Sequence, residues 1–415
     1  MPLLYDLAAG GYHSAVRAAA PFNAKARAWA AGRAGLWERL EAKKDRLRGC
    51  LWMHCASVGE FEQGRPVLEA LKAARPGLPV LLTFFSPSGY EARKDYPGAT
   101  HVDYLPPDNA GNARRLADLI TPRAAIFVKY EFWYHHLHAL KERGVPVFLV
   151  SGIFREDQPF FKWYGGPWRS MLRCYAHLFM QDERSRALLA GAGITNITVS
   201  GDTRFDRVLD IVREGAELPI AAAMTGGAPV LVCGSTWPAD DALITKALYH
   251  TGEPLRTIVA PHEHGPAQLH AIERDYPGPV VRWSALDDTA PPVPLNAATL
   301  LVDRMGLLAR LYKYGDIAYV GGGFGDGIHS ILEAATWGRP VIFGPRHTKF
   351  PEAKGLIGAG AAWQVGSAED LMALLRRLFN DRGALARAGE AAAAYVHERA
   401  GATERTVGGI LAMMG

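Results

Sequence analysis

A glycine-rich turn between two apolar runs, in residues 319–345, constrains the fold of this 415-residue chain more than any other feature. The segment YVGGGFGDGIHSILEAATWGRPVIFGP predicts a buried strand, a glycine-rich turn, a short helix over residues 330–336 and a second buried strand. Because the unit begins beyond residue 300, it is not the first strand–helix turn of an N-terminal dinucleotide fold. We therefore predict nucleotide binding in a second, C-terminal α/β domain.

The residues of this turn match the needs of a phosphorylated ligand. Gly325 and Gly327 allow positive φ and a close approach of the ligand to the backbone. The helix that follows offers unpaired amide groups, which favour an anion. Glu333, in the first turns of that helix, is placed to accept hydrogen bonds from a ribose.

Apolar runs of strand length alternate with helical patterns in two series, which predicts two parallel sheets with helices on both faces. The predicted strands are residues 50–55, 80–83, 101–104, 124–128, 145–150, 177–180 and 197–199, then 229–233, 256–259, 280–282, 298–302, 317–320, 340–343 and 361–364. We predict five parts: a basic helical segment (1–48), an N-terminal Rossmann-like domain (49–206), a linker (207–228), a C-terminal Rossmann-like domain (229–395) and a C-terminal helix (396–415).

Charge and hydropathy narrow the class of protein. The net charge of +4 argues against a nucleic-acid partner for the whole chain, but residues 17–48 carry nine Lys or Arg against three Asp or Glu. This basic segment also carries Trp29, Leu36, Trp37 and Leu40, so it reads either as a membrane-surface contact or as a solvated helical face. No run reaches the roughly 18 apolar residues that span a bilayer, and residues 1–20 do not resemble a signal peptide. The four scattered cysteines predict buried, reduced thiols.

Three polar residues of the N-terminal domain are candidates for catalysis. Glu60 follows the strand LWMHCA at a helix start, where a carboxylate acts either as a general base or as a simple helix cap. Glu131 follows the strand AAIFV among aromatic residues, where it stabilises a cationic transition state or is one acid in an aromatic cluster. Arg204 follows the last strand and binds either an anion or a neighbouring aspartate, Asp202 or Asp206.

The C-terminal domain offers further polar groups where predicted strands end. Ser235 and Thr236 precede a proline that opens a helix, so their hydroxyl groups either cap that helix or hold a phosphate. Pro261 and His262 end the next strand, and His262 with His264 favours a base or phosphate contact over a metal site. Gly306, before another helix, would let backbone amides face a nucleotide.

Taken in order, these motifs resemble the 3-deoxy-D-manno-octulosonic acid (Kdo) transferases of lipopolysaccharide synthesis. The motifs are SVGE, YEFW, GDTRFD, GSTW, APHEH, VDRMG and the glycine-rich unit, and they extend from about Trp52 to Glu352. The resemblance implies a GT-B fold, in which two Rossmann-like domains face each other across a cleft. It implies inverting, metal-independent transfer from CMP-Kdo to a lipid A precursor. It also implies no cofactor beyond this donor, and a cytoplasmic enzyme at the periphery of the inner membrane.

The resemblance also assigns roles to single residues. Glu60 matches the catalytic base, and Glu131 the second carboxylate, while Arg204 stands where the family commonly has lysine. The residues that match the cytidine-nucleotide site are Pro261, His262, Met305, Gly306, Leu307, Ser330, Ile331, Leu332 and Glu333. Three more positions and one segment depart from the usual family pattern: His262 replaces an arginine, Leu307 a glutamate and Ser330 an asparagine, and residues 1–20 are less apolar than the usual anchor.

Two other interpretations remain open at this point. One is another GT-B enzyme, such as a UDP-sugar transferase or an isomerase similar to UDP-GlcNAc 2-epimerase. The other is a non-catalytic lipid- or nucleotide-binding scaffold, against which the intact carboxylates at positions 60 and 131 argue.

Overall fold

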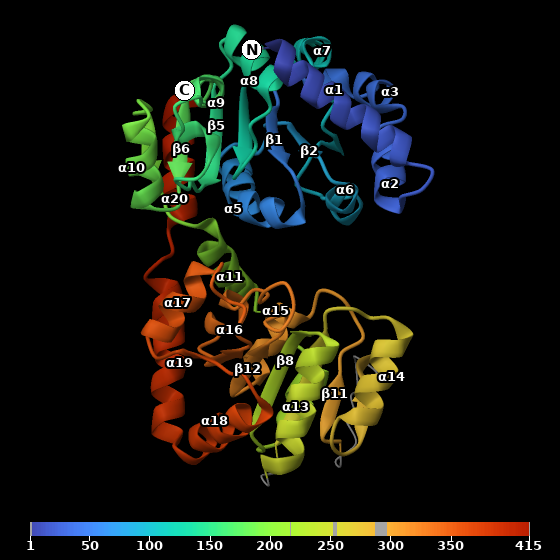
Figure 1. The fold of residues 1–415 in the computed structure, drawn as a ribbon, viewed down its shortest axis with the longest axis vertical. Coiled ribbons are helices and arrows are strands. Elements are labelled where there is room, and N and C mark those ends of the chain that lie inside the picture. The colour runs from blue at the N-terminus through green and yellow to red at the C-terminus, as the bar shows by residue number, and fades with distance from the viewer. Residues whose placement is uncertain (1, 216, 252–254, 287–296, 415) are drawn as a thin grey trace. The chain divides into compact units, whose positions relative to one another are not determined.

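The computed structural model describes residues 2–215, 217–251, 255–286 and 297–414. Two compact units divide the chain, and the second is inserted into the first: unit 1 comprises residues 1–207 and 400–415, and unit 2 comprises residues 208–399 (Figure 1). Each unit is an α/β sandwich around one parallel sheet.

Unit 1 contains seven described strands in the order β3-β2-β1-β4-β5-β6-β7, all parallel. Its strands are β1 (Leu51–Cys55), β2 (Val80–Phe84), β3 (His101–Tyr104), β4 (Ala124–Val128), β5 (Val147–Gly152), β6 (His177–Met180) and β7 (Ile197–Val199). Its helices are α1 (Pro2–Ala19), α2 (Ala24–Gly32), α3 (Leu36–Glu41), α4 (Lys44–Leu47), α5 (Val58–Ala74), α6 (Pro87–Arg93), α7 (Ala110–Ile120), α8 (Tyr134–Glu142), η1 (Pro159–Phe161), α9 (Gly166–Leu172), α10 (Glu183–Gly191) and α20 (Ala402–Met414).

Unit 2 repeats the design with seven described strands in the order β10-β11-β9-β8-β12-β13-β14. Its strands are β8 (Val230–Thr236), β9 (Arg256–Pro261), β10 (Val280–Arg282), β11 (Thr299–Leu301), β12 (Ile317–Val320), β13 (Val341–Phe343) and β14 (Ala362–Gln364). Its helices are α12 (Pro219–Thr225), α13 (Pro238–Thr251), α14 (Pro266–Asp275), η2 (Trp283–Ala285), α15 (Leu308–Leu311), η3 (Tyr312–Tyr314), α16 (Leu332–Ala335), α17 (Pro351–Gly358), α18 (Ala368–Asn380) and α19 (Arg382–His397). Helix α11 (Thr203–Glu214) crosses from unit 1 into unit 2.

All fourteen predicted strands form, with ends at most three residues from the predicted ones. Strand alternation explains the two cores of unit 1, because successive side chains point to opposite faces of a sheet. Trp52 and Phe127 belong to one core, with helices α7 and α8, and Met53 and Ile126 belong to the other, with α5 and α20. Both faces of the sheet are covered, and its strands are therefore almost wholly apolar.

The segment predicted as a linker, residues 207–228, is mostly helical. Helix α11 buries Phe205, Val208 and Leu209, which recur at the three- and four-residue spacing of an apolar helix face. Helix α12 begins at a proline and buries Ile220 and Met224. Local amphipathic patterns therefore make this segment helical, and its role as a linker stays a prediction.

The C-terminal helix packs on unit 1. The carboxylate of Asp206 accepts hydrogen bonds from the backbone amides of Gly401 (2.5 Å) and Thr403 (2.6 Å), and so caps helix α20. Ile410 is fully buried against the sheet of unit 1, beside residues of α5. Contacts between residues almost 200 positions apart in the sequence thus close the N-terminal domain.

Candidate active site

Two carboxylates lie at the carboxyl ends of neighbouring strands in unit 1. Strand β1 pairs with β2 on one side and with β4 on the other, so the gap between β1 and β4 is the topological switch point of the sheet. Ligands of open α/β sheets bind at such points, outside the carboxyl ends of the strands. Glu60 follows β1 and Glu131 follows β4, as the sequence predicted.

Glu60 sits in the first turn of α5, and its side chain is half-buried. The hydroxyl group of Ser57, the residue at the N-cap, donates a hydrogen bond to the Glu60 carboxylate. Ser57 itself makes no side-chain hydrogen bond to the helix backbone. The hydrogen bond from the serine fixes the orientation of the carboxylate, as a proton acceptor requires.

Glu131 is held in a buried network. Its side chain is 5% exposed and accepts a hydrogen bond from Trp133 Nε1 at 2.5 Å. His54 Nε2 lies 3.0 Å from Glu131 Oε2, and the hydroxyl group of Tyr175 donates to the Glu131 carbonyl oxygen at 2.5 Å. Glu131 is therefore rigidly positioned, in contrast to the solvated acid of an aromatic cluster that the sequence left open.

His54 is a residue that sequence reasoning missed. It is the last but one residue of β1, is fully buried, and places its Nδ1 atom 2.9 Å from the hydroxyl oxygen of Thr83. The available signal was a polar residue inside the fully buried strand LWMHC. Buried histidines require partners, so this one indicated a polar network behind the strand end.

Cys55 shows that the two carboxylates share one neighbourhood. Burial is the main cause of the raised pKa of the Cys55 thiol, and the negative charges of Glu131 and Glu60 raise it further. Both charges therefore act on the last residue of β1. This local concentration of acids suits a site where positive charge develops.

Arg204 is engaged by a carboxylate of its own loop. Its Nε atom donates to Asp202 at 2.9 Å, and its terminal guanidinium nitrogen lies 2.7 Å from the same side chain. The simpler of the two sequence interpretations, an ion pair with a neighbouring aspartate, is therefore what the structure contains. Its predicted catalytic role stays a prediction.

In unit 2, the glycine-rich turn follows β12 beside the switch point between β8 and β12. The amides of Gly325 and Gly327 both donate to the carbonyl oxygen of Gly322, at 3.0 and 3.2 Å. Gly327 has a φ of 142°, which a residue with a side chain rarely adopts. The turn is thus closed on itself, and the amides of these two glycines are already paired.

Asp240, which was not predicted from the sequence, holds this turn through a hydrogen bond from the Gly322 amide. It is 1% exposed and lies in the first turn of α13. Its carboxylate accepts from the Tyr319 hydroxyl (2.9 Å), the Gly322 amide (2.9 Å) and the Trp237 amide (3.0 Å). One buried acid therefore connects the end of β8, the end of β12 and the glycine-rich turn.

Three aromatic rings form a stack next to this anchor. His262 lies between Trp237 and His329, with ring centroids 4.5 and 4.4 Å apart. Trp237 Nε1 donates to His329 Nε2 at 3.0 Å, so the proton of a neutral His329 ring is on Nδ1. Burial and the neighbouring His262 lower the pKa of His329. His262, one of the residues predicted to bind nucleotide, is thereby in contact with His329, which follows the glycine-rich turn.

Strands β8 and β9 bring further predicted residues together. Thr236 pairs with Pro261 across the two strands, and the Thr236 carbonyl oxygen accepts the amide of His262 at 2.9 Å. Ser235 has a φ of 52°, a left-handed conformation that is uncommon for serine. These four residues form one continuous edge at the carboxyl ends of the two strands.

The remaining predicted nucleotide-site residues lie in two short segments. Met305 is 77% exposed, Gly306 has a φ of 82°, and Leu307 is the N-cap of α15. Ser330 is exposed, Ile331 and Leu332 are buried, and Glu333 lies in the first turn of α16. Helix α16 covers only Leu332–Ala335, which is shorter than the predicted run of 330–336, and Ile331 is its N-cap. All of these binding roles stay predictions.

Within the described ranges, no group of three or more His, Cys, Asp or Glu side chains is arranged to hold a metal ion. All four cysteines are buried free thiols, as the sequence predicted.

Comparison with known proteins decides the family. Residues 32–207 match the family model of the 3-deoxy-D-manno-octulosonic-acid transferases (kdotransferases). The chain is 31% identical over 383 residues to the 3-deoxy-D-manno-octulosonic acid transferase of Bordetella pertussis, covering 87% of this chain and 86% of that protein. This chain belongs to the Kdo transferase family. It is therefore a glycosyltransferase that transfers Kdo in the synthesis of lipopolysaccharide.

Solved structures agree on the fold. A glycosyltransferase from Rickettsia africae has a TM-score of 0.56 at 13% identity, covering 88% of this chain and 98% of its own. UDP-GlcNAc 2-epimerase from Neisseria meningitidis has a TM-score of 0.61 at 15% identity, covering 87% and 99%. Likenesses at this identity establish the two-domain GT-B architecture of this Kdo transferase, and the epimerase likeness extends no further than the fold.

Proposed function

We propose that this Kdo transferase moves Kdo from CMP-Kdo to a lipid A precursor with inversion at the anomeric carbon. We assign the acceptor to unit 1 and the cytidine nucleotide to unit 2. The main support is the placement of Glu60 and Glu131 after the two strands that flank the switch point of the first sheet.

In this mechanism Glu60 accepts the proton of an acceptor hydroxyl group. The resulting oxygen nucleophile bonds to the anomeric carbon of Kdo as the bond to the CMP phosphate breaks, and CMP leaves with the bonding electrons. Positive charge develops on the sugar, as in other glycosyl transfers, and the fixed carboxylate of Glu131 stabilises it. We assign Arg204 a supporting role beside these acids.

For the nucleotide, we propose that the turn anchored by Asp240 and the edge formed by Ser235, Thr236, Pro261 and His262 surround the phosphate. The first amides of a helix have no partner within the helix, so Ser330–Glu333 offer donors, and Glu333 offers an acceptor for ribose. We assign Met305, Gly306 and Leu307 to the second nucleotide loop.

The test of the base is Glu60→Gln. General-base catalysis contributes about 10²–10⁴-fold, so Kdo transfer should fall by at least ~100-fold while calorimetry shows unchanged CMP affinity. Glu69→Gln is the matched control, because Glu69 lies on the same helix in an exposed ion pair with Arg65. Full turnover by Glu60→Gln would refute the assignment of the base.

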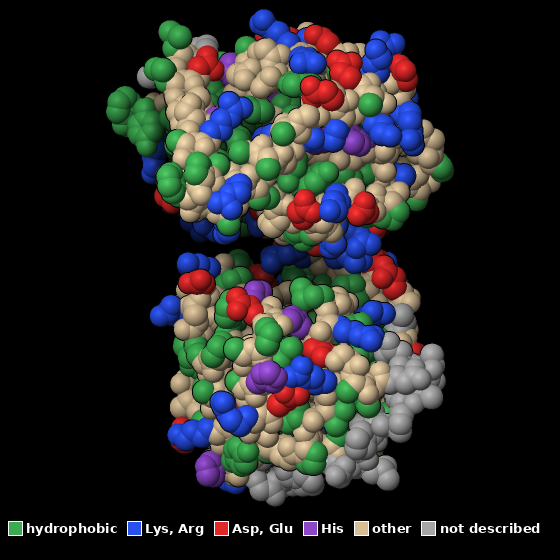
Figure 2. Space-filling view, turned by 90° about the vertical axis from the view of Figure 1, so that its right-hand side faces the viewer, with side chains coloured by type: hydrophobic (Ala, Val, Ile, Leu, Met, Phe, Trp, Pro, Cys, Tyr) green, Lys and Arg blue, Asp and Glu red, His purple; other side chains and the backbone are tan. Residues whose placement is uncertain are grey.

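We also propose that unit 1 contacts the cytoplasmic face of the inner membrane from its periphery. Leu3 and Leu7, one helical turn apart on α1, are 77% and 72% exposed, and Phe22 is 91% exposed. Lys and Arg side chains are scattered over the face of unit 1 that Figure 2 shows, among Asp and Glu side chains. No described helix is both long and apolar enough to cross a bilayer.

The structure changes which residues support this membrane contact. Trp29, Leu36 and Leu40 are at most 5% exposed, so they stabilise the core and cannot act as anchors. Arg33 stacks over Trp29 at 3.9 Å, and burial lowers its pKa to about 9. The contact therefore depends on Leu3, Leu7 and Phe22 with nearby exposed cations, and Leu3→Ser/Leu7→Ser should reduce co-sedimentation with anionic liposomes. Undiminished co-sedimentation would contradict it.

A further inference from the structure

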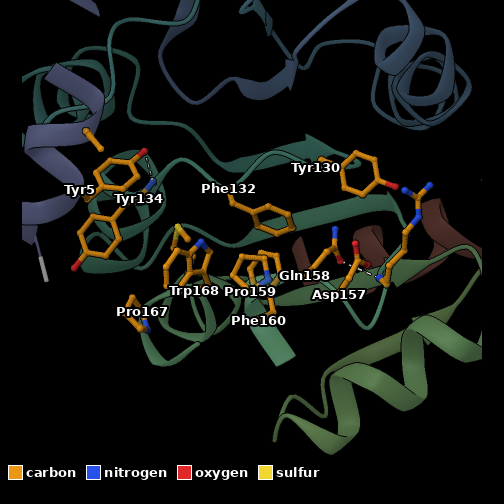
Figure 3. Close-up of a pocket in the computed structure, with 13 residues that line it drawn as sticks. Tyr5, Tyr130, Phe132, Tyr134, Asp157, Gln158, Pro159, Phe160, Pro167 and Trp168 are labelled. Carbon is orange, nitrogen blue, oxygen red and sulfur yellow. Dashed lines mark hydrogen bonds between the residues drawn. The ribbon is translucent and has the colours of Figure 1, made fainter. Parts of the chain in front are cut away.

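An apolar cavity of about 710 Å³ lies wholly within unit 1, next to the segment that carries Glu131. Aromatic and aliphatic residues line it, apart from Arg155, Asp157 and Gln158 at one end (Figure 3). Cavities of about 300–1,000 Å³ with mostly apolar walls are typical of sites for small organic ligands. None of the roles assigned above uses this cavity.

The walls of the cavity come from four segments that are held firmly together. Phe132 packs against Phe160 with ring centroids 4.7 Å apart. Tyr5 of α1 donates a hydrogen bond to Asp108 and accepts the Tyr134 amide at 3.4 Å, which fixes α1 against the start of α8 (Figure 3). The cavity is therefore built by the fold and does not depend on a ligand to form.

Two features of the cavity favour a lipid chain over another apolar ligand. The helix that forms one wall, through Tyr5 and Ala8, exposes Leu3 and Leu7 elsewhere on its surface. The α9 wall continues outward from Trp168 to Tyr164, 6.1 Å away between ring centroids. Tyr164 in turn contacts Trp163, which is 93% exposed. Apolar surface thus continues from the cavity to the outside of the unit.

Polar groups at one end of the cavity, Arg155, Asp157 and Gln158, suit the head group of a lipid. Arg155 lines the cavity and is exposed, and its guanidinium group makes no ion pair within the described part of the chain. At the Glu131 side, Tyr130 and Phe132 are wall residues, whereas the carboxylate between them is directed to His54 and Trp133. An acceptor held here would have its apolar part in the cavity and its polar part beside the candidate catalytic acids.

We propose that this cavity binds a fatty acyl chain of the acceptor, and so makes acceptor affinity depend on acylation. The inference rests on the proposed lipid acceptor and specifies how unit 1 recognises it. Each buried methylene strengthens binding by about fourfold. Even a few acyl carbons in the cavity would therefore contribute more to acceptor affinity than the contacts of the sugar.

The first test compares acceptors in the full-length enzyme. Ala8→Trp places a bulky ring at an exposed wall position, and Ala18→Trp is the matched control on the same helix outside the cavity. For Ala8→Trp, we expect the KM for a tetraacylated lipid A precursor to rise at least ~10-fold, with the KM for its deacylated sugar bisphosphate unchanged. Equal effects on both acceptors, or on neither, would overturn the proposal.

A second test needs no transfer and separates this inference from the proposed function. A bromine-labelled twelve-carbon fatty acid should quench tryptophan fluorescence saturably, and Trp168→Phe should remove most of the quenched signal. Trp163→Phe is the control, because Trp163 is exposed and does not line the cavity. If the lost signal follows Trp163, the chain lies on the outer surface and the cavity proposal fails. If quenching follows Trp168 but no Kdo is transferred to any lipid A acceptor, the proposed function fails instead.

Discussion

Asp240 offers the sharpest test of how unit 2 holds its glycine-rich turn. Its buried carboxylate accepts three hydrogen bonds, from the Tyr319 hydroxyl and the amides of Gly322 and Trp237. In Asp240→Ala all three donors lose their acceptor inside the protein. A buried donor without a partner costs about 1–3 kcal/mol, and because neighbouring terms are not additive, we expect a loss of about 3–5 kcal/mol in local stability.

Asp240→Asn separates charge from geometry. Both amide donors reach the same oxygen, Oδ2, while Tyr319 uses Oδ1. An asparagine that keeps its oxygen at the Oδ2 position retains both amide bonds, and its NH₂ group then donates to the Tyr319 oxygen. We therefore expect Asp240→Asn to lose only about 1 kcal/mol, the usual net value of one hydrogen bond.

Hydrogen exchange measures this difference locally, which matters because two units need not unfold together. Peptides covering residues 317–329 should exchange much faster in Asp240→Ala than in Asp240→Asn, and calorimetry should show CMP affinity reduced at least ~10-fold, or about 1.4 kcal/mol. Asp275→Ala, which removes an exposed ion pair with Arg274, is the control. Unchanged exchange and unchanged CMP affinity in Asp240→Ala would show that the turn does not depend on this acid.

Three further outcomes follow from other parts of the chain. Burial and His262 lower the pKa of His329 in the folded state, so the unfolded state binds more protons below about pH 6.5. The free energy of unfolding, measured by urea titration, should therefore fall below that pH. The fall should be smaller in His329→Gln. Asp206→Ala removes the cap of α20 and should cost about 0.5–2 kcal/mol, seen as earlier proteolysis of α20; an unchanged digestion rate would contradict this. Burial and the charges of Glu131, Glu60 and Glu62 raise the pKa of the Cys55 thiol, so it should resist alkylation at pH 8 until the protein is denatured. Labelling of the native protein would refute its placement.

The strands were predictable because a sheet covered on both faces needs continuous apolar runs, and the chain contains fourteen of them. Glu60 and Glu131 were predictable for a related reason: a polar residue directly after such a run lies at the carboxyl edge of the sheet. The sequence alone does not show which strand ends are neighbours in the sheet. The sheet order β2-β1-β4 brings residues 60 and 131 to adjacent strands, and that order depends on packing between distant segments.

The buried polar contacts that hold each candidate site could not be predicted from the sequence, for the same reason. His54 and Glu131 meet across strands, and Asp240 contacts Tyr319 from 79 residues away. In the sequence, Asp240 reads as an ordinary acid in a first helical turn, where acids are common. Only the fold shows that its side chain turns away from solvent toward the glycine-rich turn.

These buried residues change the explanation of the glycine-rich turn. The sequence suggested a phosphate site made by glycine amides ahead of a helix, yet Gly325 and Gly327 donate to Gly322, and the helix has only four residues. Glycine serves here to make a tightly closed loop, and Asp240 holds that loop at Gly322. Under our proposal, the donors for a nucleotide phosphate come from residues around the loop, including His262, whose ring stacks between Trp237 and His329. Stacking on both faces fixes the orientation of the His262 ring, so a neutral imidazole at this position can offer a directed hydrogen bond without the permanent charge of an arginine.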